Sequence, residues 1–235
     1  MDLSTFTPGS ALVVVIALAI APFFAVMVTS FTKIVVVLSL LRNALGLQQV
    51  PPNIVLNGLS LILTLYVMYP VGQQMQAAIA QGPTAGIEQS MPMPGGAPGG
   101  PGVLSSTNTM LNAVDAGKEP LRGFLLKHSS PTERGFFLKT AQRVGDPNRA
   151  AEMTERDFIV VIPAFVVREL SLAFQVGFLI FLPFLVIDLV ISNILLAMGM
   201  MMLSPTTISL PFKLLLFVLV DGWVKLAHGL VLSYV

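Results

Sequence analysis

Long apolar stretches alternate with shorter polar ones along this 235-residue chain. The first covers residues 10–45 and contains no charged residue before Lys33. A helix of about 20 apolar residues spans the hydrocarbon core of a bilayer. Further apolar stretches cover Ile54–Tyr69, which ends at Pro70, and residues 158–235. We therefore predict an all-α, membrane-associated protein whose apolar helices pair as two hairpins.

Turn and cap signals mark the ends of the predicted helices. Gly46 suits a helix C-cap after the first stretch, and Pro51-Pro52-Asn53 signals a turn and a helix start. Ser130-Pro131-Thr132-Glu133 has the form of a capping box with proline at the first helical position. The helix that follows this box should end near Gly145-Asp146-Pro147.

These signals divide the chain into four parts. Residues 1–81 form an N-terminal hydrophobic hairpin. Residues 82–102 are a flexible linker, because more than half of them are glycine or proline and cannot bury enough apolar surface to order themselves. Residues 103–157 form a small charged helical module. Residues 158–235 form a C-terminal hydrophobic hairpin with a methionine-rich loop.

Composition narrows the class of protein. The chain is 54% hydrophobic and 11% charged, whereas soluble domains carry about 25% charged residues. Most of the charges lie between Asp115 and Asp157, so the remainder of the chain is suited to lipid. The net charge of +1 gives no basic surface for nucleic acid. With no cysteine and only two histidines, no thiolate or histidine metal site is expected, and no cofactor is implied.

The N-terminal stretch is interpreted as a retained membrane segment. No lysine or arginine precedes it, and it continues past the small-x-small sequence at Ala17-Leu18-Ala19, which argues against a cleaved signal peptide. Short loops rich in basic residues stay cytoplasmic. If Lys33 and Arg42 face the cytoplasm, the charged module is periplasmic, and the protein is a multi-pass protein of the bacterial inner membrane.

Small residues recur at helical spacing in both halves of the chain. Ala17, Ala21 and Ala25 are four residues apart, and so are Ala173 and Gly177. Such rows allow a second helix to approach closely in lipid. The alternative for the first row is that alanine simply fills an apolar helix.

Charged residues interrupt the C-terminal half. Arg168 and Glu169 together would weaken membrane insertion by roughly 5–7 kcal/mol if both faced lipid, so we expect them to be buried against protein or in a wet lumen. Asp188 and Lys213 are further intramembrane charges. For Lys213, a functional role and a snorkelling anchor at a helix end remain open.

A second set of polar residues has the spacing of one helical face. Asp221, Lys225 and His228 lie at i, i+4 and i+7, so Asp221 and Lys225 can pair. The two interpretations are a proton relay and a structural ion pair, and the structural pair is favoured.

The segment Met198-Gly199-Met200-Met201-Met202 places four methionines in five positions, just before Ser204-Pro205. Three consecutive methionines cannot share one side of a helix, because neighbouring side chains point about 100° apart. If the chain leaves the helix at Gly199, they can line one edge of a loop. Methionine adapts to irregular cross-sections, so in a symmetric ring these edges would form a deformable collar around a pore. The alternative is that these methionines only fill a core.

Several motifs resemble the FliP/SctR family of export-gate proteins, which includes YscR, HrcR and SpaP. In the N-terminal half they are Thr29-Ser30-Phe31-Thr32-Lys33, Leu41-Arg42-Asn43-Ala44-Leu45-Gly46 and Pro51-Pro52-Asn53. In the C-terminal half they are Leu182-Pro183-Phe184, Gly199-Met200-Met201-Met202, Leu210-Pro211-Phe212-Lys213 and Val220-Asp221-Gly222-Trp223. The resemblance covers nearly the whole chain. The absent signal peptide and Leu47-Gln48-Gln49-Val50 favour the SctR branch of injectisomes over flagellar FliP.

The resemblance implies a pentameric, pseudo-helical ring that conducts unfolded proteins across the inner membrane in type III secretion. It implies SctS and SctT (FliQ and FliR in flagella) as partners in the ring, and SctU and SctV as further partners. Met200, Met201 and Met202 would be the gasket that seals the closed pore. Lys213 matches a charged family position near the channel, while Arg168, Glu169, Asp188 and Asp221 are expected as channel or assembly charges.

Two other classes of function are weighed against the export gate. A small-solute or ion-coupled transporter would use Lys213, Asp221 and Asp188 for coupling, but the two apolar halves show no repeat of the kind common in transporters. A membrane enzyme lacks a nucleophile–base pair, and no phosphate-binding loop is present. We therefore expect a non-enzymatic protein.

Overall fold

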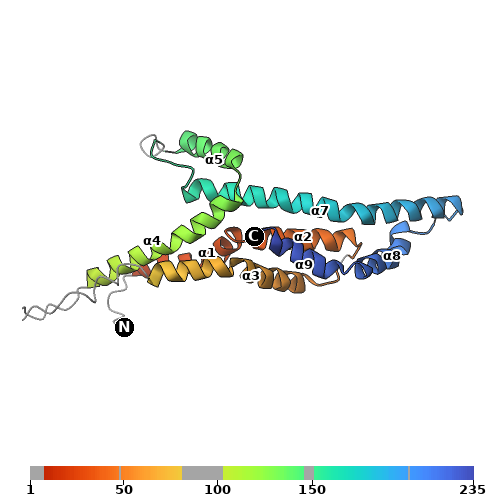
Figure 1. Cartoon of the computed structure of the whole chain (residues 1–235), viewed down its shortest axis with the longest axis horizontal. Helices are drawn as coiled ribbons and strands as arrows, with labels where there is room; N and C mark the ends of the chain where they lie inside the picture. The colour runs from red at the N-terminus through yellow and green to blue at the C-terminus, as the bar shows by residue number, and fades with distance from the viewer. Residues whose placement is uncertain (1–7, 48, 81–102, 146–150, 201) are drawn as a thin grey trace, which may run out of the picture. The chain divides into compact units, whose positions relative to one another are not determined.

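In the computed structural model the described residues are 8–47, 49–80, 103–145, 151–200 and 202–235, and their regular structure is entirely helical (Figure 1). The all-α prediction is confirmed. The predicted linker 82–102 lies outside the described residues. The helices are α1 (Pro8–Met27), α2 (Phe31–Ala44), α3 (Asn53–Ala80), α4 (Val103–His128), α5 (Pro131–Val144), α7 (Phe158–Ala197), α8 (Pro205–Leu219) and α9 (Gly222–Leu232).

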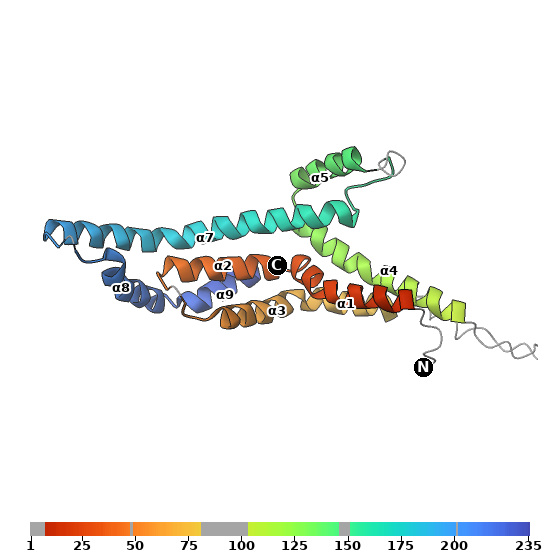
Figure 2. The ribbon, with the colours of Figure 1, turned by 180° about the vertical axis from the view of Figure 1, so that it is seen from behind.

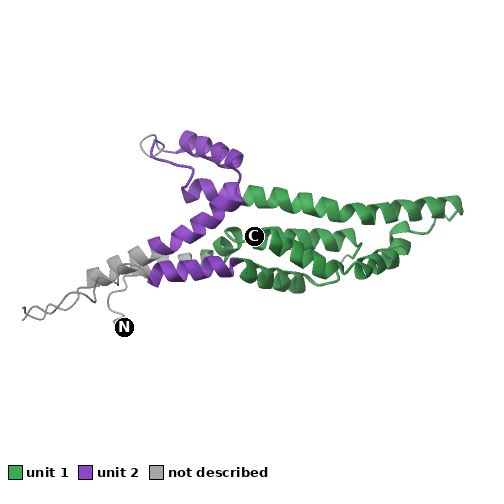
Figure 3. Cartoon of the chain, in the orientation of Figure 1, with its two compact units in different colours: residues 1–67, 166–235 green, residues 68–165 purple. Residues whose placement is uncertain are grey.

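The chain forms two compact units (Figure 3). One unit joins the first and last parts of the sequence, residues 1–67 and 166–235, and the other covers residues 68–165. Helices α3 and α7 contribute residues to both units. The first unit contains nearly all of the residues that the sequence analysis singled out.

The first apolar stretch is two helices rather than one. Helix α1 ends at Met27 and α2 begins at Phe31, with Ser30 as its N-cap. Val28 and Ser30 in the break are both buried. The expectation of one continuous helical segment was therefore wrong. The break could not be predicted from the sequence, because it contains neither glycine nor proline.

Helix α2 ends as its sequence predicts. Gly46 has a φ of +78°, which glycine adopts without a Cβ clash. Its N–H donates to the Asn43 oxygen at 3.0 Å, and the N–H of Leu47 donates to the Arg42 oxygen at 3.2 Å. These two bonds form a Schellman motif, which satisfies carbonyls at the helix end. The Arg42 guanidinium also donates to Asn53 Oδ1 at 2.6 Å, which links the end of α2 to the start of α3.

Helix α3 starts at Asn53 as predicted, but it does not stop at Pro70. It continues to Ala80, a length of 28 residues. Proline removes one backbone hydrogen bond from a helix, and membrane helices tolerate this loss when other groups satisfy the freed carbonyl. The longer helix exceeds the roughly 20 residues that a span requires, so the second apolar stretch lies in a helix long enough to cross a membrane.

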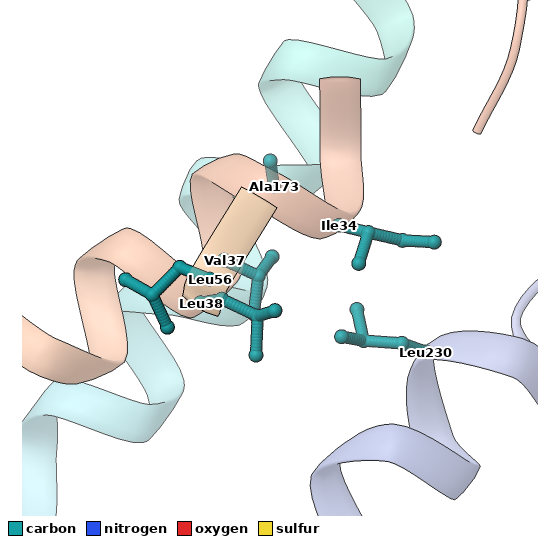
Figure 4. Packing of buried hydrophobic residues seen from close by; sticks show 6 residues of the cluster. All are labelled: Ile34, Val37, Leu38, Leu56, Ala173 and Leu230. Atoms are coloured by element: carbon teal, nitrogen blue, oxygen red, sulfur yellow. The ribbon is translucent and has the colours of Figure 1, made fainter. Parts of the chain in front are cut away.

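Helix α2 lies at the centre of the first unit. Its buried residues Ile34, Val37, Leu38 and Leu41 follow the i, i+3, i+4, i+7 spacing of one helical face. Burying each of these side chains stabilises the fold by about 1.5–3 kcal/mol. Both views show α2 beside α9 (Figures 1 and 2). The cluster around α2 draws residues from four helices: Ile34, Val37, Leu38, Leu56, Ala173 and Leu230 (Figure 4).

The second unit contains the charged module. Ser130 is the N-cap of α5 and accepts a hydrogen bond from the N–H of Thr132, with Pro131 at the first helical position. The helix ends at Val144 with Gly145 as its C-cap, as predicted. Within the described residues the reciprocal bond from the Ser130 N–H to Glu133 is not formed, and one Glu133 carboxylate oxygen is buried without a hydrogen-bond partner.

Two polar and aromatic contacts hold this unit together. Arg134 of α5 donates to the Leu126 and Ser129 carbonyl oxygens at 3.2 and 3.0 Å, which satisfies the end of α4. The rings of Phe124 and Phe165 lie 5.7 Å apart in its core. Helix α5 itself buries no residue, and Phe136 on its surface is exposed.

Two helices, α3 and α7, are long and apolar enough to cross a membrane, and the number rises to three if the bent pair α8 and α9 is one span. This count covers the described part of the chain.

Candidate functional site

The methionine-rich segment leaves α7 through a sharp turn. Gly199 has a φ of +72°. Its N–H donates to the Leu196 oxygen at 3.0 Å, and the N–H of Met200 donates to the Leu195 oxygen at 2.9 Å. This is again a Schellman motif. Helix α8 begins at Pro205, so the predicted departure from the helix at Gly199 is confirmed.

The methionines of this loop are exposed. The exposed fraction is 61% for Met198, 41% for Met200 and 100% for Met202. Met201 lies outside the described residues. Exposed methionine is unusual for a soluble surface but suits an interface whose partner changes shape. Interpretation of these methionines as core filler is wrong for the three described side chains, because none of them lies in the core of this chain.

A buried lysine braces the two helices that carry the loop. Lys213 of α8 is 3% exposed, and its ammonium lies 2.7 Å from Asp188 Oδ2 on α7. It also donates to the Ala44 oxygen at the end of α2, at 3.3 Å. Ser209 donates to Asp188 Oδ1 at 2.5 Å. Lys213 is therefore not a snorkelling anchor. Its ion pair with Asp188 and its hydrogen bond to Ala44 tie α8 to both α7 and α2.

A second buried charge cluster joins α2, α7 and the C-terminal residues. Lys33 lies 3.9 Å from Glu169 Oε2, and the two side chains are 3% and 1% exposed. The Lys33 ammonium also lies 3.9 Å from the centre of the Tyr234 ring, a cation–π contact. The Tyr234 hydroxyl donates to Glu169. Burial, followed by the Glu169 charge, raises the pKa of Tyr234, so this phenol stays protonated as a donor.

Burial of Glu169 agrees with the insertion argument, whereas its neighbour Arg168 is only half-buried. Arg168 makes no ion pair within the described residues. Sequence reasoning missed Ser209 and Tyr234 as members of the two clusters. The only signal for either residue is a polar side chain within an apolar stretch, and that signal does not identify a partner.

The predicted pair between Asp221 and Lys225 is not formed. Helices α8 and α9 meet at a bend of 61°. Asp221 lies at this bend with a φ of +52° in the left-handed region, and α9 begins only at Gly222. A contact at i, i+4 requires both residues in one helix. The Lys225 N–H still donates to the Asp221 oxygen at 3.1 Å, but Asp221 is the left-handed N-cap of α9 and lacks the helical side-chain direction, so the prediction of an ion pair was wrong.

This geometry separates the charges that the transporter hypothesis would combine. Lys213 and Asp188 are paired with each other, whereas Asp221 lies at the exposed bend without an ion pair in the described part of the chain. Within those same residues, no group of three acidic or histidine side chains could hold a metal ion.

The small residues occupy two different environments. Ala173 is fully buried in the cluster around α2. A β-carbon built at Gly177 would overlap the Leu40 side chain, lying 3.1 Å from its Cβ atom, so α7 approaches α2 closely at this glycine. Ala25 on α1 is exposed, while the side chains of Ala17 and Ala21 lie outside the described residues.

This close approach yields a stability prediction. Replacing Gly177 with leucine forces α7 away from Leu40 and should lower the free energy of unfolding by about 1–3 kcal/mol. The matched control is Gly58→Leu, because a β-carbon at Gly58 meets nothing within 4 Å. Chemical unfolding of both variants in detergent, followed by circular dichroism, measures the difference. Equal losses in the two variants would contradict close packing at Gly177.

Comparisons with known proteins agree on one family. A family model described as the FliP family matches residues 14–230. The chain is 49% identical to the pathogenicity-related ORF2 of Xanthomonas campestris pv. glycines over 95% of each chain. It is 48% identical to the hypersensitivity response secretion protein HrcR of Ralstonia nicotianae, over 96% of this chain and 97% of the relative. The Yop proteins translocation protein R of Yersinia pestis is 47% identical, over 95% and 94%.

Proposed function

This chain belongs to the FliP family, and we propose that it is a core subunit of the export gate of a type III protein secretion system. Similarity to a hypersensitivity response secretion protein and to a Yop translocation protein favours the injectisome branch over the flagellar one. The length and apolar character of helices α3 and α7, together with the similarity to type III secretion proteins, support a location in the bacterial inner membrane.

The observation that carries this proposal is the exposed methionine loop at the turn between α7 and α8. Met198, Met200 and Met202 are apolar and exposed, and the paired charges Lys213 and Asp188 brace the helices behind them. A loop held in this way presents the same apolar edge in every copy of the chain. In a ring of copies the edges meet and form a collar that closes around an unfolded chain without one fixed packing.

The finer features of the assembly belong to the same proposal. The ring contains five copies of this chain, with SctS-like and SctT-like subunits completing a pseudo-helical complex. SctU-like and SctV-like proteins of the export apparatus dock against it, and the cargo is unfolded secreted protein. The charged module is periplasmic. Support comes from the polar character of that module and from the two apolar half-chains that flank it.

The proposal predicts that ions leak through the complex when the methionine side chains of the collar are shortened. Replacing Met200, Met201 and Met202 with alanine removes the long side chains and should raise ion permeability severalfold in membranes that contain the assembled complex. Replacing them with leucine, which is of similar volume, should leave the seal largely intact. Release of a small fluorescent dye from proteoliposomes measures the permeability of the alanine and the leucine variants.

The control for this experiment is Met27→Ala, which removes an exposed methionine from α1 rather than from the loop. Assembly is checked for every variant by native mass spectrometry of the complex. Unchanged permeability in complexes that carry the triple alanine variant would count against the methionine seal. A leak in the Met27 variant would show that the loop is not special.

A further inference from the structure

A cavity of about 410 Å³ lies in the first unit, between α2, α7 and α9. Its lining is mostly apolar, with Leu172, Val176 and Ile180 on α7 facing Leu226 and Leu230 on α9. A pocket of this volume lies within the range of about 300–1,000 Å³ that small-molecule sites occupy.

Two lysines line this otherwise apolar cavity, and only one of them is paired with a carboxylate. Lys33 is buried, and Glu169 neutralises it across 3.9 Å. Lys225 is exposed and makes no ion pair within the described residues. The cavity therefore has one uncompensated positive charge, at Lys225. The only other polar side chain of the lining, Ser233, donates its proton to the Leu230 carbonyl.

The bend at Asp221 is the reason that Lys225 lacks a partner. In a straight helix, Asp221 would lie one turn before Lys225 and neutralise it. The left-handed backbone at Asp221 removes that carboxylate from the helical face. The sequence thus contains the acid that would balance the lysine, and the fold keeps the two apart.

We propose that this cavity binds an anionic phospholipid of the surrounding membrane, with an acyl chain between α7 and α9 and the phosphate on Lys225. Helix α7 and the bent pair α8 and α9 flank the cavity and are long and apolar enough to cross a membrane, so lipids are its neighbours when the separate chain lies in the bilayer. Basic pockets between transmembrane helices bind anionic headgroups. An uncharged lipid fills the same apolar space but leaves the ammonium without a counter-charge.

The test measures lipid retention by native mass spectrometry of the full chain in detergent, titrated with dioleoylphosphatidylglycerol or dioleoylphosphatidylcholine. The wild-type chain should retain phosphatidylglycerol about fivefold more strongly, the preference that one lysine near a headgroup supplies. Lys225→Gln should abolish that preference and leave phosphatidylcholine binding unchanged. Lys225→Arg should keep the preference, which separates the charge from folding of the region.

A second variant tests the cavity rather than the charge. A β-carbon at Gly229 meets nothing within 4 Å, so Gly229→Leu extends into the open space and should reduce retention of both lipids. Gly58→Leu, on α3, is the matched control for the added side chain, and Lys139→Gln, on exposed α5, is the control for the lost charge. Circular dichroism establishes that each variant is folded.

Three results would overturn the proposal. Equal retention of the two lipids by the wild-type chain would remove the role of Lys225, and so would a preference that survives Lys225→Gln. If the complex co-purified with its neighbouring subunits retains no lipid that Gly229→Leu can displace, while the separate chain binds phosphatidylglycerol, the cavity is a subunit interface instead.

Discussion

Replacing Lys33 with methionine should lower the free energy of unfolding by about 3 kcal/mol. Lys33 and Glu169 are both almost completely buried, and removing one partner of such a pair leaves a charge without compensation, at a cost of about 3–5 kcal/mol. The hydrogen bond from Tyr234 still reaches Glu169, so we expect the lower end of that range. Chemical unfolding of the detergent-solubilised chain measures the loss.

Two further variants make this result specific. The double variant Lys33→Met with Glu169→Leu removes both charges and should recover part of the lost stability, because apolar replacement of a buried pair is often neutral but the Tyr234 hydroxyl loses Glu169 as its acceptor. Lys139→Met removes an exposed lysine from α5 and should change stability by less than about 0.5 kcal/mol. If the double variant is less stable than Lys33→Met alone, the pair does not act as a unit.

Local chemistry was sufficient to predict the ends of several helices. Gly46 and Gly199 both lie where a helix ends in a left-handed residue, and Ser130-Pro131 begins α5. Each of these signals acts through the backbone of its own segment, within a few residues. They can therefore be recognised without knowledge of the tertiary fold.

Other features depend on contacts that the sequence does not reveal. The break after Met27 contains no helix breaker, and Pro70 is accommodated inside α3. Asp221 enters the left-handed region, which aspartate reaches more readily than most residues but does not require. Sequence spacing predicted a pair there because it assumed one continuous helix.

Partners of the buried charges were beyond prediction for a related reason. Lys213 contacts a carbonyl 169 positions away in the sequence, and Glu169 accepts a hydrogen bond from a residue 65 positions away. Lys213 and Glu169 were expected to be important charges, because intramembrane charges are rare. Their partners become visible only when α2, α7 and the C-terminal residues are brought together in one unit.

Replacing Lys213 with methionine should abolish secretion, because the residue braces the methionine loop. Without the ammonium, Asp188 loses its counter-charge and the Ala44 carbonyl loses a donor. Asp188 is 28% exposed, so water offsets part of the loss, and we expect stability to fall by about 2 kcal/mol. Export of type III substrates into the culture medium is the primary readout.

Loss of secretion alone would not separate bracing of the loop from general instability, and Lys33→Met supplies the comparison. That variant should destabilise the chain more than Lys213→Met, yet it leaves the contacts between α8 and α7 in place. Complexes that still assemble should therefore leak ions with Lys213→Met and stay sealed with Lys33→Met. Asp188→Asn should fall between Lys213→Met and the wild type, because Lys213 keeps its bond to Ala44. Equal leakage in all three variants would mean that the ion pair stabilises the fold without positioning the loop.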